Sequence, residues 1–277
     1  MLTIKIVVTG STGFIGTALC KKLEEKKEYS IIKVTRSKKD KDGFYQVNNY
    51  QNCPSGDILI HLGEDPDRNK VNEAGNFYQQ KSTKVIKSIL IKDYKKIIYC
   101  SSSVVYGDQG VEPYGENMPT YADDVYSTAK LENEKRVLNS GGIVVRLSNV
   151  IGNNKSKNNI LSDIIKQLSE EGSLTIRNIN PIRDFIWIED AVDAIVSLLQ
   201  KNTSGVFNIG SGIATSIDQL TKTVLNIAGQ RDREVKSIIT SSEYAYSVLN
   251  VEKIKKITGW KPKHTLFQSI KKMVNRL

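Results

Sequence analysis

Cysteine and histidine are scarce in this chain. Its three cysteines, Cys20, Cys53 and Cys100, are an odd number and lack the close spacing of a metal-binding cluster. We therefore expect free thiols in a reducing compartment rather than disulfide bonds. The two histidines, His61 and His264, form no metal-ligand or catalytic-triad pattern, so we expect no metal site. His61 ends an apolar run and is expected to be a core residue.

Long apolar runs are also missing. No stretch approaches the roughly 20 residues that a helix needs to cross a bilayer, so we expect no membrane span. The chain opens directly on a strand-like segment at 4–8, which leaves no room for a signal peptide. Together with the cysteine pattern, these absences indicate a cytoplasmic protein.

Positive charge, by contrast, is in excess, with a formal net charge of +10. Such an excess can indicate a nucleic-acid partner. Most of the clustered lysines lie on expected helix faces, and no aromatic side chains alternate with them as base stacking would require. We therefore expect no nucleic-acid partner, and assign the charge to solvated helix faces that weakly attract anionic ligands. The clusters are Lys21 and Lys22, Lys26 and Lys27, Lys38, Lys39 and Lys41, and Lys253, Lys255 and Lys256.

Strand-like and helical segments alternate over the first half of the chain. Expected strands cover 4–8, 31–35, 44–47, 58–62, 97–101 and 143–146, and expected helices cover 15–27, 75–91 and 124–139. Alternating strands and helices predict parallel strands with helices on both faces. The fold class is therefore α/β, a doubly wound parallel sheet of the Rossmann type.

A glycine-rich loop follows the first strand at once. Gly10, Gly13 and Gly16 are spaced three apart and open the next helix. Gly10 permits the tight turn, Gly13 lets backbone N–H groups approach a pyrophosphate, and Gly16 lets the helix pack closely on the strand. The helix N-terminus adds the positive end of its dipole. The loop predicts a dinucleotide site that contains Gly10, Thr12, Gly13, Phe14, Ile15 and Gly16.

Further motifs follow the loop in order, over nearly the whole chain. They are DILIHLG at 57–63, SSSVVYG at 101–107, YSTAK at 126–130, RLSNVIG at 146–152, RDF at 183–185 and GWKP at 259–262. With TGSTGFIG at 9–16, this series resembles the extended short-chain dehydrogenase/reductase family, the nucleotide-sugar epimerases and dehydratases. The resemblance implies a nicotinamide cofactor and a nucleotide-sugar substrate. It adds Leu62, Gly63 and Ser148 to the expected cofactor site.

The end of the second strand bears on the choice between NAD and NADP. An acidic residue there would bind the adenosine ribose hydroxyls of NAD. This chain has Arg36 and Ser37 instead, and no carboxylate until Asp40. An arginine can pair with the 2′-phosphate of NADP, so we favour NADP over NAD, with Arg36 and Ser37 in the site. The alternative is that Arg36 stacks on adenine in an NAD enzyme.

Tyr126 and Lys130 are four residues apart and therefore share a helix face, which Asp123 or Asp124 can cap. A free tyrosine has a pKa of about 10, and a neighbouring ammonium favours its phenolate. The resemblance implies that Ser102 hydrogen-bonds the reacting sugar oxygen while Tyr126 moves its proton. Lys130 would also hold the nicotinamide ribose. The catalytic residues expected are thus Ser102, Tyr126 and Lys130, with the cofactor supplying hydride chemistry.

Two further residues match positions that bind the substrate diphosphate region in the epimerases this chain resembles. They are Asn149 and Arg183, which join Ser102 and Tyr126 as substrate-binding candidates. The alternative for Arg183 is a surface ion pair with Asp184. The family's second phosphate-binding arginine, near 240, is replaced by TSSE at 240–243. Arg231, Arg233 or Lys236 are candidates to substitute for it.

The segment after Ser102 narrows the reaction. Sugar dehydratases and decarboxylases that resemble this family carry an acidic residue there, whereas this chain has Ser103 and Val104. The nearest carboxylate, Asp108, follows Gly107 and is expected to be solvated. We therefore predict redox chemistry at C4 without dehydration, foremost a nucleotide-4-keto-6-deoxyhexose reductase. The alternatives are a UDP-sugar 4-epimerase with retained NAD, a non-catalytic dinucleotide-binding regulator, and an RNA-binding protein that only the net charge supports.

The second half of the chain departs from the alternating pattern. Residues 149–181 hold one expected helix, at 161–171, whereas 185–200 and 206–209 return to the sheet. A capping box at 216–219 starts a helix that ends near 229, and basic amphipathic helices at 251–258 and 266–277 close the chain. We assign 1–148 with 182–210 to the dinucleotide-binding domain, and 149–181 with 211–277 to a smaller C-terminal substrate lobe.

The resemblance also implies a homodimer built on two helices. The apolar residues Val85, Ile86, Ile89 and Leu90 offer a stripe on one helix, and Val137 and Leu138 add to the other. The same residues can instead face the sheet within one subunit.

Overall fold

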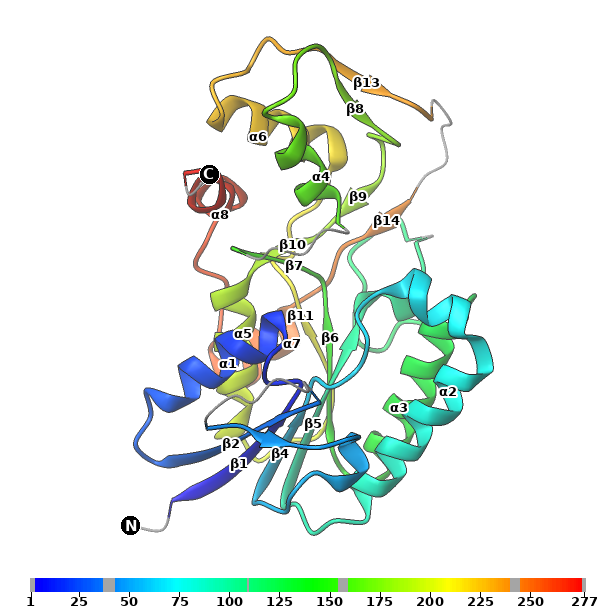
Figure 1. The fold of residues 1–277 in the computed structure, drawn as a ribbon, viewed down its shortest axis with the longest axis vertical. Coiled ribbons are helices and arrows are strands. Elements are labelled where there is room, and N and C mark those ends of the chain that lie inside the picture. The colour runs from blue at the N-terminus through cyan, green and yellow to red at the C-terminus, as the bar shows by residue number, and fades with distance from the viewer. Residues whose placement is uncertain (1–2, 37–42, 109, 154–158, 240–244, 276–277) are drawn as a thin grey trace.

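A seven-stranded parallel sheet forms the centre of the computed structural model, which describes residues 3–36, 43–108, 110–153, 159–239 and 245–275 (Figure 1). Its strand order is β11-β6-β5-β4-β1-β2-β3, and every neighbouring pair is parallel. The strands are β1 (Ile4–Thr9), β2 (Tyr29–Thr35), β3 (Tyr45–Gln46), β4 (Ile58–His61), β5 (Lys96–Ser102), β6 (Ile143–Leu147) and β11 (Gly205–Ile209). The predicted doubly wound sheet is confirmed, and its order reverses between β1 and β4, where such sheets bind ligands.

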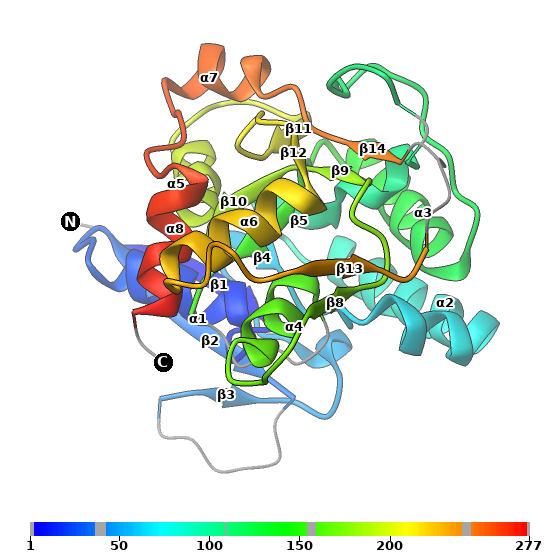
Figure 2. The same cartoon turned by 90° about the horizontal axis from the view of Figure 1, so that it is seen from above.

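Helices cover both faces of the sheet (Figures 1 and 2). Helices α1 (Phe14–Glu24) and α5 (Ile188–Leu199) pack together on one face, and α2 (Arg68–Leu90) and α3 (Val125–Asn139) on the other. Because successive strand residues point to opposite faces, each strand contributes to two cores. In β5, Ile98 and Cys100 join the α1–α5 side, whereas Ile97 and Tyr99 join the α2–α3 side.

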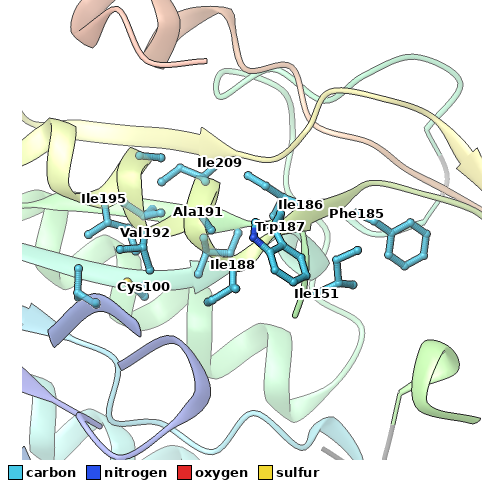
Figure 3. Packing of buried hydrophobic residues seen from close by; sticks show 14 of the residues in the cluster. Cys100, Ile151, Phe185, Ile186, Trp187, Ile188, Ala191, Val192, Ile195 and Ile209 are labelled. Carbon is cyan, nitrogen blue, oxygen red and sulfur yellow. The ribbon is translucent and has the colours of Figure 1, made fainter. Parts of the chain in front are cut away.

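The larger core gathers around α5 (Figure 3). Figure 3 shows Ile188, Val192 and Ile195 of that helix lying between α5 and the sheet, with Cys100 of β5 and Ile209 of β11 nearby. Strands β4 and β6 are buried on both faces along their whole length, whereas β3 at the edge of the sheet is exposed. This double burial explains why the strands occur in the sequence as continuous apolar runs rather than as alternating ones.

Helix α2 differs from its sequence-based prediction. It begins at Arg68 rather than at 75, because Asp67 caps the first turn by accepting a hydrogen bond from the Lys70 amide. Gly75, with φ of 56° and ψ of −142°, is not helical and divides α2 at a kink into two helical segments, the second of which corresponds to the helix predicted over 75–91. Half of the apolar stripe expected at a dimer interface is buried in the core between α2, α3 and the sheet, namely Ile86, Ile89 and Val137. Its other members, Val85, Leu90 and Leu138, are partly exposed and pack against that core.

A smaller lobe stands beyond the carboxyl ends of the strands, at the top of Figure 1. In it α4 and α6 pack together, α8 packs on α6, β8 pairs with β13, and β9 lies between β12 and β14. The remaining elements of the chain, with two 3₁₀ turns in the first half, are η1 (Tyr50–Asn52), η2 (Ser103–Tyr106), β7 (Asn149–Ile151), α4 (Ile160–Gln167), β8 (Leu174–Ile176), β9 (Ile182–Arg183), β10 (Phe185–Trp187), β12 (Thr215–Ser216), α6 (Ile217–Ile227), β13 (Val235–Ser237), β14 (Tyr246–Ser247), α7 (Glu252–Thr258) and α8 (Leu266–Val274). None of the helices in the described part of the chain is long and apolar enough to cross a membrane.

Candidate active site

The glycine loop joins β1 to α1 in a conformation that only glycine permits. Gly10 has φ of 67°, and a Cβ there would lie 2.6 Å from the carbonyl oxygen of Leu62. A Cβ on Gly16 would lie 2.1 Å from the Gly10 carbonyl oxygen, so the helix can approach the loop only with glycine at 16. Helix α1 has Gly13 as its N-cap, no side-chain cap and no acidic residue in its first turn. Its first N–H groups are thus left for an anion, which fits the pyrophosphate of a dinucleotide.

A cavity of about 380 Å³ opens over this loop. Other walls come from Tyr50, Glu64, Val150 and Ile151. Of the residues predicted to bind the cofactor, it brings together Gly10, Thr12, Gly13, Phe14, Ile15, Gly16, Arg36, Leu62 and Gly63. Ser37 lies outside the described residues.

Tyr50 lines the cavity, although none of the sequence motifs indicated this residue. Its hydroxyl accepts a hydrogen bond of 3.1 Å from the Gly10 amide, and its ring fills the space that a Cβ on Gly63 would need. The Arg36 guanidinium lies 4.8 Å from the centre of the same ring. Arg36 therefore stacks on an aromatic side chain of its own subunit, at the edge of the cavity.

His61 is a buried residue at the end of β4, as expected. Its Nδ1 atom lies 2.8 Å from Thr9 Oγ1, and its Nε2 atom has no hydrogen-bond partner in the described part of the structure. Burial lowers the pKa of His61 to about 4, so the ring is neutral near pH 7. The other histidine, His264, donates a 3.0 Å hydrogen bond from its Nδ1 atom to the buried carboxylate of Asp190.

The three predicted catalytic residues come from two adjacent elements. Ser102 ends β5 and caps η2 by accepting a hydrogen bond of 3.3 Å from the Val104 amide. Tyr126 lies in the first turn of α3, which Asp124 starts with a capping box. The Asn72 side chain of α2 accepts a hydrogen bond from the Tyr126 amide and so fixes the start of α3 against α2.

Lys130 lies one turn beyond Tyr126 and is buried. Its ammonium nitrogen is 5.8 Å from the centre of the Tyr126 ring and donates a hydrogen bond of 3.1 Å to the Cys100 carbonyl oxygen. It also forms an ion pair of 2.5 Å with Glu64, which the sequence analysis missed. Burial disfavours the charged form of each side chain, but the attraction between the two opposite charges outweighs this effect. The pKa of Glu64 is lowered and that of Lys130 is raised, so both stay charged.

The substrate-side candidates lie where β7 and β9 meet the lobe. Asn149 donates a hydrogen bond of 3.0 Å to the Asp184 carbonyl oxygen, and Ser148 donates one of 3.3 Å to the Asp184 carboxylate. The Arg183 guanidinium pairs at 2.8 Å with Asp108, not with Asp184. Asp108 was expected to be solvated; it is half exposed and ion-paired, so an incoming phosphate would compete with it for Arg183.

Asp184 has a structural role instead. Its buried carboxylate accepts hydrogen bonds from the Ser211 hydroxyl and from the amides of Ser211, Gly212 and Leu249. It thereby ties the residues just after β11 and the segment between β14 and α7 to the residue that joins β9 to β10.

The three candidates to replace the missing arginine bind groups of the lobe itself. Arg231 donates to the Asn226 side chain, Arg233 to backbone carbonyls that include Gly172, and Lys236 pairs with Glu234. None of them lines the cavity over the glycine loop. The segment 240–243 lies outside the described residues.

The sheet, the glycine loop at its switch point and the Ser-Tyr-Lys cluster define a Rossmann enzyme of the short-chain dehydrogenase type. The chain belongs to the NAD dependent epimerase/dehydratase family, whose model matches residues 6–210. It is 26% identical to a putative UDP-glucose 4-epimerase of Methanocaldococcus jannaschii, over 98% of this chain and 97% of that one. It is 22% identical to dTDP-4-dehydro-6-deoxyglucose reductase of Escherichia coli, over 98% and 97%.

Solved structures share the fold. The structure of RMD from Pseudomonas aeruginosa complexed with NADPH has a TM-score of 0.86 at 22% identity, covering 99% of this chain and 98% of that one. UDP-glucose 4-epimerase from Thermotoga maritima, with UDP-glucose, has a TM-score of 0.84 at 23% identity and covers 98% of both chains.

Proposed function

We propose that this enzyme is an NADP-dependent oxidoreductase acting at C4 of a nucleotide-activated sugar, foremost a nucleotide-4-keto-6-deoxyhexose reductase. The observation that carries the proposal is the placement of Ser102, Tyr126 and Lys130 at the carboxyl ends of the strands, without an acid at 103 or 104. Ser103 and Val104 belong to η2, where Ser103 is buried. Relatives that include a 4-keto-sugar reductase and 4-dehydrogenases support C4 as the reacting carbon.

In this mechanism the Tyr126 hydroxyl donates its proton to the C4 oxygen of the keto sugar while Ser102 hydrogen-bonds the same oxygen. A bound nicotinamide supplies the hydride. Lys130 would hold the nicotinamide ribose of a bound cofactor, and its positive charge would stabilise the phenolate that forms when Tyr126 gives up its proton. Asn149 and Arg183 bind the substrate diphosphate, and Arg183 exchanges Asp108 for a phosphate oxygen.

The second candidate is a UDP-sugar 4-epimerase with retained NAD. The stacking of Arg36 on Tyr50 favours it, because an arginine engaged with an aromatic ring need not select a 2′-phosphate. The 4-epimerases among the relatives and solved structures support the same candidate.

One set of assays separates these candidates. The purified protein is analysed by mass spectrometry for bound small molecules, then incubated with a nucleotide-4-keto-6-deoxyhexose and NADPH. We expect stoichiometric oxidation of NADPH and no retained NAD. Tightly held NAD, with interconversion of a UDP-hexose and its C4 epimer, would support the epimerase. Formation of a 4-keto-6-deoxy product from a nucleotide hexose would show dehydration and contradict the inference from Ser103 and Val104.

Arg36 tests the cofactor preference. In Arg36→Ala the enzyme is expected to lose roughly 1.5–3 kcal/mol of NADPH binding and much less of NADH binding, because only NADPH carries the 2′-phosphate. Fluorescence titration with both reduced cofactors measures the difference. Lys33→Ala is the matched control, since Lys33 lies on β2, which Arg36 directly follows, but pairs with Glu24 away from the cavity. Equal losses for both cofactors would show that Arg36 contributes only stacking.

We also propose a homodimer, on the family resemblance alone. Three members of the apolar stripe that first suggested it are buried within the subunit, so the interface would use the partly exposed Val85, Leu90 and Leu138 and other exposed residues of α2 and α3. Light scattering at micromolar concentration is expected to give twice the mass of one chain. A single-chain mass would contradict the proposal.

A further inference from the structure

Glu64 occupies a position between two cavities. It lines the cavity over the glycine loop and also a second one of about 270 Å³ that Ser82, Tyr78 and Lys70 share. Its carboxylate is buried and accepts hydrogen bonds of 2.7 Å from Ser82, 2.8 Å from Tyr99 and 3.0 Å from Asn133. With Lys130 as a fourth donor, the carboxylate is held in place by groups from α2, β5 and α3.

Lys130 has few other charges around it. The titratable groups around Lys130 lie on four elements and one loop. They are His61 on β4, Glu64 in the loop after it, Tyr99 and Cys100 on β5, Tyr78 on α2, and Tyr126 and Glu134 on α3. Burial raises the pKa of Tyr78, Tyr99 and Cys100, so these groups are neutral near pH 7. His61 is neutral as well, and Glu134 is bound to Arg146. Glu64 is therefore the counter-ion of Lys130 among the described residues.

A buried ammonium without an anion beside it is strongly destabilised, and either loses its proton or draws charge onto a neighbouring acidic group. If Glu64 were neutral, the phenolate of Tyr126 would be the anion available to compensate the Lys130 charge, because the centre of its ring is 5.8 Å from the ammonium. With Glu64 charged, the ammonium is already compensated and Tyr126 can keep its proton. Ketone reduction requires that protonated form, because Tyr126 must give a proton to the sugar oxygen.

We propose that Glu64 is a positioning residue that compensates the Lys130 charge and thereby sets the pH at which Tyr126 gives up its proton. The proposal rests on the proposed function in one respect, that Tyr126 is the group that transfers the proton.

Glu64→Gln tests the proposal, because it removes the charge and keeps the side-chain volume and one acceptor oxygen. The near-ultraviolet absorbance of phenolate is followed against pH in the parent and in Glu64→Gln. The same titration in each background with Tyr126→Phe is subtracted to isolate Tyr126. Removing a negative charge favours the phenolate, so its midpoint is expected to move to lower pH by roughly one unit. The alkaline fall in the rate of ketone reduction should move in the same direction by a similar amount.

Tyr99→Phe is the matched control. It removes a hydrogen bond to the Glu64 carboxylate but no charge, so it should leave the Tyr126 midpoint in place. Glu64→Asp keeps the negative charge but moves it away from Lys130, so the Tyr126 midpoint is expected to move to lower pH by less than in Glu64→Gln. If Glu64→Gln does not fold, Glu64→Asp provides the test in its place. Unchanged midpoints in the folded Glu64 variants would overturn the proposal.

The titration needs no substrate, so the two ideas fail separately. An acid shift in a protein that reduces no nucleotide sugar would overturn the proposed function and support the counter-ion. Turnover of a keto sugar by the parent, with no shift of the Tyr126 midpoint in Glu64→Gln, would support the proposed function and overturn the role of Glu64 as counter-ion.

Discussion

Tyr126→Phe is expected to lower the turnover number by about 10²–10⁴-fold, the contribution usual for a positioned general acid or base. The substitution removes the hydroxyl that carries the proton and leaves the ring, which is 9% exposed and packed at the start of α3. Cofactor binding should survive, because the glycine loop and Lys130 are untouched. Steady-state kinetics and a fluorescence titration with the reduced cofactor measure the two quantities separately.

Tyr121→Phe is the control for this variant. Tyr121 precedes α3 and is 55% exposed, so the loss of its hydroxyl should leave turnover within about twofold of the parent, as for most surface substitutions. If Tyr126→Phe also kept activity within a few-fold, another group would have to move the proton.

The parts of the site that the sequence predicted are those encoded by a short stretch of chain. The glycine loop is one such part, since its spacing determines both the turn and the approach of α1 to β1. The Tyr126–Lys130 pair is another, because a separation of four places two side chains on one helix face. The strands were predicted well for a related reason. Burial on both faces requires continuous apolar runs, as in 58–61 and 143–147.

The parts that were missed depend on contacts between distant elements. Glu64 follows directly after the predicted Leu62 and Gly63, but its partners Ser82, Tyr99 and Asn133 come from three other elements. A carboxylate three residues beyond the end of a buried strand is a signal that such a residue needs a buried partner. Asp108 and Arg183 are 75 residues apart, and no spacing rule relates them.

Glu134→Ala is expected to destabilise the protein by about 3–5 kcal/mol, because it leaves one partner of a buried ion pair without its counter-charge. The Glu134 carboxylate receives two donors of Arg146, with Nη2 at 2.7 Å and Nε at 3.2 Å from Oε2. The two side chains are 2% and 6% exposed. Burial opposes the charge on Arg146, and Glu134 raises the pKa of the guanidinium in the parent. In the variant that support is lost, but a guanidinium is so basic that it stays charged, now without a partner.

The measurement is urea unfolding, with the midpoint and slope compared at pH 7. Glu132→Ala is the matched control. It lies on the same helix, pairs with Arg136 at 3.4 Å on a partly exposed face, and should cost about 0.2–1 kcal/mol. Replacing Glu134 and Arg146 together by leucine should recover most of the loss, because no buried charge is left without a partner. A loss below about 1 kcal/mol for Glu134→Ala would mean that water or another group compensates Arg146.

The same variant also separates stability from catalysis. Glu134 lies one turn beyond Lys130 and accepts a hydrogen bond from Ser101, next to Ser102, so it ties α3 to the end of β5. It does not touch the Lys130 ammonium, whose partners are Glu64 and the Cys100 carbonyl. Under conditions in which the variant stays folded, Glu134→Ala should therefore retain far more turnover than Tyr126→Phe. The dependence of its turnover on pH should be unchanged. A shifted profile would place the Glu134–Arg146 pair within the electrostatics of the proton transfer itself.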